Sequence, residues 1–189
     1  MLKKLEEVLH RLPSMFSKTE IWQSLVINKR KPTTYRVFTT LDCGSRVCLH
    51  RFLPCDTHEA FYHPHPWPAA FLLLRGAYQM KLGYAVHGSQ DLKPVDVSEL
   101  LLTTGSRYEI VDPDTWHSVA PLCETYTIMV NDAPWDADHV SDGVRTTKGK
   151  DLDSLSTEEL EQSLNMFSYL LTTYQLQFQH LVKGPCDGL

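Results

Sequence analysis

Two histidines separated by one residue, His63 and His65 in the segment HPHPW, are the side chains of this sequence best placed to do chemistry. In an extended chain residues i and i+2 point to the same side, so both imidazoles would face one way. A third histidine, His117, follows the proline-containing turn PDTW much further along the chain. Neutral imidazole nitrogens bind iron, zinc, copper, nickel and manganese. These three histidines are therefore the candidate metal ligands, provided that the fold brings His117 to the pair.

The remaining histidines give weaker signals. His58 is a spare candidate, but the segment DTHEA around it is typical of a loop. Five others have no partner at ligand spacing and suggest surface or packing roles. The alternative for the three candidate ligands is that they are ordinary hydrogen-bonded histidines in the protein interior.

Short strands dominate the middle of the chain. From Thr33 to about Asn131, β-branched and aromatic runs are separated by turns rich in Gly, Pro and Asp. The expected strands are Tyr35–Leu41, Arg46–Leu53, Ala69–Arg75, Tyr78–Tyr84, Ser98–Thr103, Arg107–Val111, His117–Ala120 and Thr125–Val130. Because no helical pattern lies between them, they predict an antiparallel sandwich or barrel of the jelly-roll kind.

The positions of the histidines within these strands resemble the cupin superfamily. His63, His65 and Gly76 match its first motif, and Pro113 and His117 match its second. The resemblance implies a mainly β fold, a double-stranded β-helix barrel, with the three histidines as ligands of one metal ion. The sequence departs from the pattern where cupins usually carry a glutamate ligand, since Ala69 stands there.

A three-histidine site without a carboxylate resembles that of the cysteine dioxygenase-like thiol dioxygenases. The stretch around HRF and HPHPW is also similar to small bacterial and phage cupins of uncharacterised function. The resemblance implies Fe(II) as the metal, although Zn, Ni, Mn and Cu fit the same nitrogen ligands. A site with no carboxylate carries more positive charge, which favours an anionic substrate.

Two further residues are candidates for substrate binding. Arg51, in the expected strand LHRFL, would pair with an anionic group if its guanidinium turned into the barrel. The alternative is that it faces solvent. Tyr78, just after Gly76, would supply an aromatic wall and a proton donor.

The segments outside the barrel divide the chain into four parts. Residues 1–32 form a helical extension, 33–131 the barrel, 132–155 a polar loop that contains Trp135, and 156–184 an amphipathic helix. Ser156 and Glu159 form a capping box at the start of this helix. Its apolar stripe comprises Leu160, Leu164, Phe167, Leu171, Tyr174, Phe178 and Leu181. The stripe either packs on the barrel or forms the seam of a homodimer.

Composition narrows the class of protein. A formal net charge of −5 and the lack of a basic stripe argue against a nucleic-acid partner. No apolar run approaches the ~20 residues of a membrane span, so no membrane partner is expected. The five cysteines form no CxxC pair and suggest reduced thiols in a cytoplasmic protein.

The sequence thus favours a metal-binding cupin, a non-haem iron oxygenase acting on a small polar or anionic molecule, of which a thiol is one case. One alternative is a non-enzymatic small-molecule binding or sensor protein, with the C-terminal helix as its partner surface. The other is a metal-dependent isomerase or hydrolase. Metal content separates the sensor from the enzymes, and oxygen consumption separates the enzymes from one another.

Overall fold

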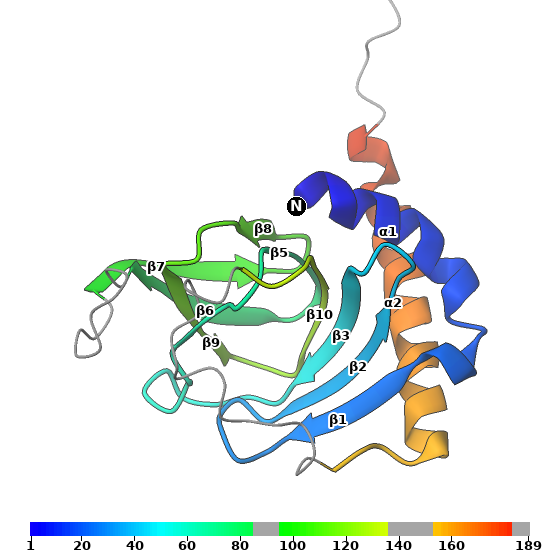
Figure 1. Ribbon diagram of the computed structural model, residues 1–189, viewed down its shortest axis with the longest axis horizontal. Coiled ribbons are helices and arrows are strands. Elements are labelled where there is room, and N and C mark those ends of the chain that lie inside the picture. Colours follow the sequence, from blue (N-terminus) through cyan, green and yellow to red (C-terminus); the bar gives the residue numbers. More distant parts are fainter. Residues whose placement is uncertain (85–94, 136–152, 183–189) are drawn as a thin grey trace, which may run out of the picture.

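Two antiparallel sheets form the body of the protein in the computed structural model, which describes residues 1–84, 95–135 and 153–182. The six-stranded sheet contains, in spatial order, β1 (Gln23–Ile27), β2 (Thr34–Thr40), β3 (Arg46–Phe52), β10 (Thr125–Asn131), β5 (Ala69–Arg75) and β8 (Arg107–Ile110). The four-stranded sheet contains β4 (His63–Pro64), β9 (Thr115–Pro121), β6 (Ala77–Tyr84) and β7 (Val95–Thr103). The two sheets curve around a common interior (Figure 1). The predicted mainly β barrel is confirmed.

The six-stranded sheet is apolar on both faces. On β3, Val47 and Leu49 belong to the core cluster that includes the helices, whereas Cys48 between them belongs to a separate cluster inside the barrel. On β10, Ile128 faces the helices and Met129 faces the interior. Because neighbouring side chains on a strand point to opposite faces, this alternation identifies the inner side of each strand.

Helices α1 (Leu2–Met15) and α2 (Thr157–Val182) cover the outer face of this sheet (Figure 1). Ser156 and Glu159 cap the start of α2, since the Ser156 hydroxyl and backbone N–H both donate to the Glu159 carboxylate. The stripe residues Leu164, Phe167, Leu171 and Tyr174 are buried in the shared core. The expectation that the stripe packs on the barrel is confirmed, whereas a homodimer stays a prediction.

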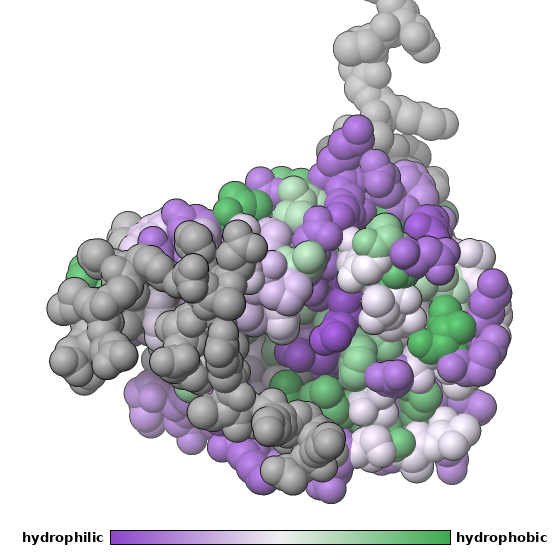
Figure 2. Space-filling view, in the orientation of Figure 1, coloured by the Kyte–Doolittle hydropathy of each residue, from purple (hydrophilic) through white to green (hydrophobic). Residues whose placement is uncertain are grey.

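The exposed side of the helical layer is mostly hydrophilic. Figure 2 shows hydrophilic residues over the outside of α1, with single hydrophobic residues between them. No helix in the described ranges is both long enough and apolar enough to cross a bilayer. The described cysteines are Cys43, Cys48, Cys55 and Cys123, and all four are free thiols.

Two strands were not expected from the sequence. β1 lies inside segment 1–32, which was expected to be helical, and its five residues pair in register with β2. The apolar run in β1 has only three residues, Leu25–Ile27, which is too short to distinguish a helix from a strand, and pairing with β2 decides between them. β4 has only two residues, too few for any periodic signal. In the polar loop 132–155, residues 136–152 lie outside the described part of the chain.

Gly76 occupies the turn between β5 and β6. Its φ angle of +101° lies in the region that favours glycine, and a Cβ there would come within 2.9 Å of the Glu124 carbonyl oxygen. The turn therefore requires glycine at the position where the first cupin motif has one.

Candidate metal centre

Strand pairing brings the three candidate ligands together. β4 pairs with β9 so that His63 lies directly opposite His117. His65 follows two residues after His63 and points to the same side. The ring centroids are 4.8 Å apart for His63 and His117 and 4.6 Å apart for His65 and His117. One nitrogen from each of the three residues lies within 4.8 Å of the others. The three rings therefore form a group that could hold a metal ion, and their role as ligands stays a prediction.

The nitrogens of His65 and His117 lie within hydrogen-bond distance of each other, and which of the two donates depends on the tautomer. The Nε2 atoms of His65 and His117 are 2.7 Å apart, and the Nδ1 atoms of both are buried without a partner among the described residues. His63 Nδ1 lies 3.0 Å from the Phe61 carbonyl oxygen. Because that oxygen can only accept, Nδ1 carries the proton and Nε2 is the free ligand atom of His63.

Burial keeps the three imidazoles neutral. It lowers the pKa of His63 to about 4 and the pKa values of His65 and His117 well below the ordinary value. A neutral imidazole has the lone pair that a metal ion needs, whereas an imidazolium has none. At neutral pH no proton has to be displaced before a metal binds.

The donor set fits a divalent transition metal. With metal–nitrogen bonds of about 2.1 Å, nitrogens in adjacent coordination positions lie roughly 3.0 Å apart, a few tenths of an ångström more than the His65–His117 separation. The place of the usual cupin glutamate is taken by Ala69, which is fully buried in β5. The candidate ligands are therefore three neutral imidazole nitrogens, with no carboxylate from that position.

Aromatic rings form the wall behind the histidines. The Phe71 ring lies 5.5 Å from the His65 ring and 6.0 Å from the His117 ring, and Trp67 meets His65 edge-on. The indole N–H of Trp67 is buried without a hydrogen-bond partner in the described part of the chain. The chamber therefore offers both an apolar surface and an unused donor.

Tyr78 lies inside the barrel but one layer away from the histidines. Its hydroxyl donates to the Tyr108 hydroxyl at 2.9 Å, and Tyr108 stacks on Phe71 at 4.5 Å. Burial raises the pKa of Tyr78 and of Tyr108, so both phenols stay protonated. Phe71 and Tyr108 stand between Tyr78 and the metal ligands, so a contact between Tyr78 and substrate stays a prediction.

Arg51 does not turn into the barrel. It shares the side of β3 that bears Val47 and Leu49, is 42% exposed, and forms an ion pair with Glu124. The inward guanidinium belongs instead to Arg36 on the neighbouring strand β2. The expectation that Arg51 faces the chamber is corrected, because strand alternation aims it outward.

Arg36 is the basic residue that the sequence did not single out. It pairs in register with His50, and its Nε donates to His50 Nε2 at 2.8 Å. The Arg36 side chain is half-buried, and burial of its guanidinium lowers the pKa of Arg36. Its positive charge also contributes, after burial, to the lowered pKa values of His63 and His65. None of the ion pairs formed by described residues includes Arg36.

Trp135 holds the ligand segment from outside. Its indole N–H donates to the His65 carbonyl oxygen at 3.1 Å, and its backbone N–H donates to the Pro66 carbonyl oxygen at 2.9 Å. Trp135 therefore packs against the barrel. It positions the segment that carries His65.

Comparison with known proteins gives similarity in part of the structure. No protein-family model matches the sequence, and no curated protein matches it. Hydroxypropylphosphonic acid epoxidase from S. wedmorenis is similar over 57% of this chain and 55% of that chain, with 16% identity and a TM-score of 0.44. The structure of FeII HppE matches over 53% of this chain and 56% of that one, with 18% identity and a TM-score of 0.39. The chain thus spans about half the length of these structures.

Similarity of this extent does not carry the chemistry of the epoxidase to this chain. The candidate site is defined by its own residues, two buried histidines and the partly buried His63, on or next to two paired strands of the barrel. The chain is accordingly a mainly β protein in which His63, His65 and His117 form a group that could hold a metal ion.

Proposed function

We propose that this protein is a metal-dependent enzyme, a non-haem iron oxygenase that acts on a small anionic molecule, with a thiol carboxylate as the first candidate. The observation that carries the proposal is the joint presence, in one interior, of three neutral histidines and one guanidinium without a carboxylate partner among the described residues. A chamber of this kind is positive as soon as it holds a divalent cation.

The ligands His63, His65 and His117 leave further coordination positions open on a divalent iron, which would supply redox chemistry at an exchangeable site. The protein supplies binding and orientation. Arg36 offers N–H donors in a planar fork that matches a carboxylate. Since one of its donors is held by His50, the direction of the guanidinium is fixed before a substrate arrives.

The aromatic wall contributes by excluding water. Phe71 and Trp67 lie against His65 and leave little room for solvent on that side. Electrostatic attraction between Arg36 and an anion is stronger in such surroundings than in bulk water. The Trp67 N–H adds a donor for a second acceptor atom of the substrate.

Metal analysis of the purified protein is the first test. Wild type, loaded anaerobically with Fe(II) and freed of excess ion, is expected to retain about one metal ion per chain. His63→Ala and His117→Ala should retain less than a tenth of that amount, because each removes one of three ligands. His58→Ala is the matched control, since His58 is an exposed turn residue, and should load like wild type.

Oxygen consumption is the second test. Iron-loaded wild type should consume oxygen in the presence of small thiol carboxylates, and the two ligand variants should not. Metal content with no oxygen uptake across a panel of small anions would refute the oxygenase and favour a metal-dependent isomerase or hydrolase. Equal metal content in wild type and in His117→Ala would refute the metal site altogether.

A further inference from the structure

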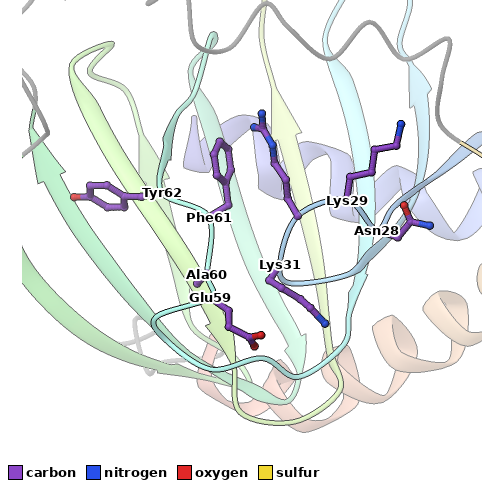
Figure 3. A pocket seen from close by; sticks show the side chains of 8 residues that line it. Asn28, Lys29, Lys31, Glu59, Ala60, Phe61 and Tyr62 are labelled. Carbon is purple, nitrogen blue, oxygen red and sulfur yellow. The ribbon is translucent and has the colours of Figure 1, made fainter. Parts of the chain in front are cut away.

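A pocket of about 450 Å³ opens beside the metal centre. It is lined by the connection between β1 and β2, residues Asn28, Lys29, Arg30 and Lys31, and by the segment before β4, residues Glu59, Ala60, Phe61 and Tyr62 (Figure 3). Neither segment belongs to the group of metal ligands. The pocket is much larger than one carboxylate or phosphate group requires.

Backbone contacts join the two sides of the pocket. The Phe61 N–H donates to the Lys31 carbonyl oxygen at 2.9 Å, and Lys31 and Ala60 form a parallel β-bridge. Phe61 in turn stacks on the His63 ring, with 5.2 Å between centroids and 7° between planes. His63 is the least buried of the three candidate ligands. The pocket therefore adjoins the metal centre on its more accessible side.

Positive charge gathers on one side of this pocket. Figure 3 shows Lys29 and Phe61 pointing to one side of the connection, whereas Lys31 and Glu59 point to the other. The Arg30 guanidinium lies over the face of the Phe61 ring, 4.0 Å from its centroid. No ion pair among the described residues includes Lys29 or Arg30. In a chain with a net charge of −5, these two adjacent exposed cations give the pocket a local positive charge.

We propose that Lys29 and Arg30, supported by Phe61, bind a phosphoryl group of a ligand whose other end reaches the metal centre. The second half of this statement rests on the proposed function. Stacking on Phe61 fixes the guanidinium plane while its N–H edges stay free, which suits two-point binding of phosphate oxygens. Lys29 adds a point charge that favours a dianion over a singly charged carboxylate.

The proposed phosphoryl site and Arg36 would bind different parts of one ligand. Arg36 lies inside the barrel and is a single guanidinium, which suits one carboxylate. Lys29 and Arg30 lie outside the ring of histidines, across Phe61. A small molecule with a phosphoryl group at one end and a reacting group at the other would span the pocket and the chamber.

Calorimetric titration with inorganic phosphate and inorganic pyrophosphate at low ionic strength tests the pocket itself. The double variant Lys29→Gln/Arg30→Gln should bind pyrophosphate at least tenfold more weakly than wild type. The matched control is Lys3→Gln/Arg11→Gln, which removes two exposed cations from α1 and should change the affinity less than twofold. Equal losses in both double variants would mean a general charge effect, and this result would overturn the proposal. So would the lack of any binding to wild type.

The same titration in His117→Ala separates this proposal from the proposed function. The pocket should bind pyrophosphate in that variant as it does in wild type, since no pocket residue is changed. Proximity to the metal centre is tested by phosphorus NMR of pyrophosphate with protein loaded with Co(II), compared with protein loaded with Zn(II). Paramagnetic broadening that disappears in Lys29→Gln/Arg30→Gln is the expected result. Binding without broadening would overturn the link between pocket and metal centre.

Discussion

Replacing Arg36 by methionine should abolish anion selectivity while leaving the metal centre in place. Methionine keeps an unbranched, flexible apolar stem but is shorter than arginine and has no charge. Arg36 contacts His50 and none of the three candidate ligands by a hydrogen bond in the described structure. Metal content should therefore equal that of wild type.

The magnitude follows from the surroundings of the guanidinium. The Arg36 guanidinium is partly removed from water by burial, which lowers its pKa, and no carboxylate among the described residues forms an ion pair with it. A hydrogen bond to a charged group contributes about 1.5–3 kcal/mol. Loss of a carboxylate contact of about 1.5–3 kcal/mol weakens binding roughly 10- to 150-fold.

A matched pair of ligands isolates this contribution. Binding of 3-mercaptopropionate and of 3-mercaptopropanol to Co(II)-loaded protein can be followed by visible absorption, since both have the thiol and only the first has a carboxylate. Arg36→Met should weaken binding of the acid by the factor above and binding of the alcohol by less than threefold. A small change at the metal would alter the affinities for both thiols alike, so the ratio of the two dissociation constants reports the carboxylate contact alone.

Arg51→Met is the control variant. Arg51 is the register partner of Tyr35, the residue next to Arg36 on β2. Unlike Arg36, it lies on the helix-covered face of the sheet and forms an ion pair with Glu124. It should bind both ligands like wild type. Equal affinity of Arg36→Met and wild type for 3-mercaptopropionate would refute the assignment of Arg36 as the anion-binding residue.

Three further predictions concern the supports of the site. Trp135→Phe keeps the ring but loses the donor to the His65 carbonyl, so metal affinity measured by competition with a chelator should fall several-fold, and an unchanged affinity would contradict the positioning role. Gly83→Ala places a Cβ against the Tyr62 hydroxyl, which should displace the segment before His65. The melting temperature should fall by several degrees and the metal content should fall with it. An unchanged melting temperature and an unchanged metal content would count against this prediction. Burial lowers the pKa of His50, so in metal-free protein the unfolded chain takes up a proton near pH 6.5 that the folded chain does not. The free energy of unfolding should therefore fall as the pH drops from 7 to 5. His50→Gln should reduce this slope by up to about 1.4 kcal/mol per pH unit in urea titrations, and an equal slope in the variant and wild type would refute the assignment.

Most of the barrel could be predicted because strand signals are local. Expected strands such as Ala69–Arg75 and Arg46–Leu53 agree with β5 and β3 within one residue at each end. The pairing of His63 with His117 could be expected only through the resemblance of motif order and spacing to the cupins. Pairing between β4 and β9 joins residues far apart in sequence, and no local pattern determines it.

The choice between Arg36 and Arg51 could not be made from the sequence, and the reason is physical. In most antiparallel sheets one face is polar, so alternation reveals which side is buried. Here Leu49 packs under the helices and Cys48 packs inside the barrel, so both faces of β3 are apolar. With hydrophobic residues on both sides, a single arginine gives no indication of the face to which it belongs.

The two-residue length of β4 has a consequence for the kinetics of the metal. His63 is held to β9 by a ladder of only two residue pairs, whereas the neighbouring pairing of β6 with β9 extends over seven. Segments with few ladder contacts open locally at much lower free energy than the whole domain unfolds. Release of a bound ion should then follow the opening of this short segment. Amide hydrogen exchange at His63 and His65 and the rate of metal loss to a chelator should therefore rise together with temperature. The barrel would remain folded throughout, so the ion could be exchanged without unfolding its host.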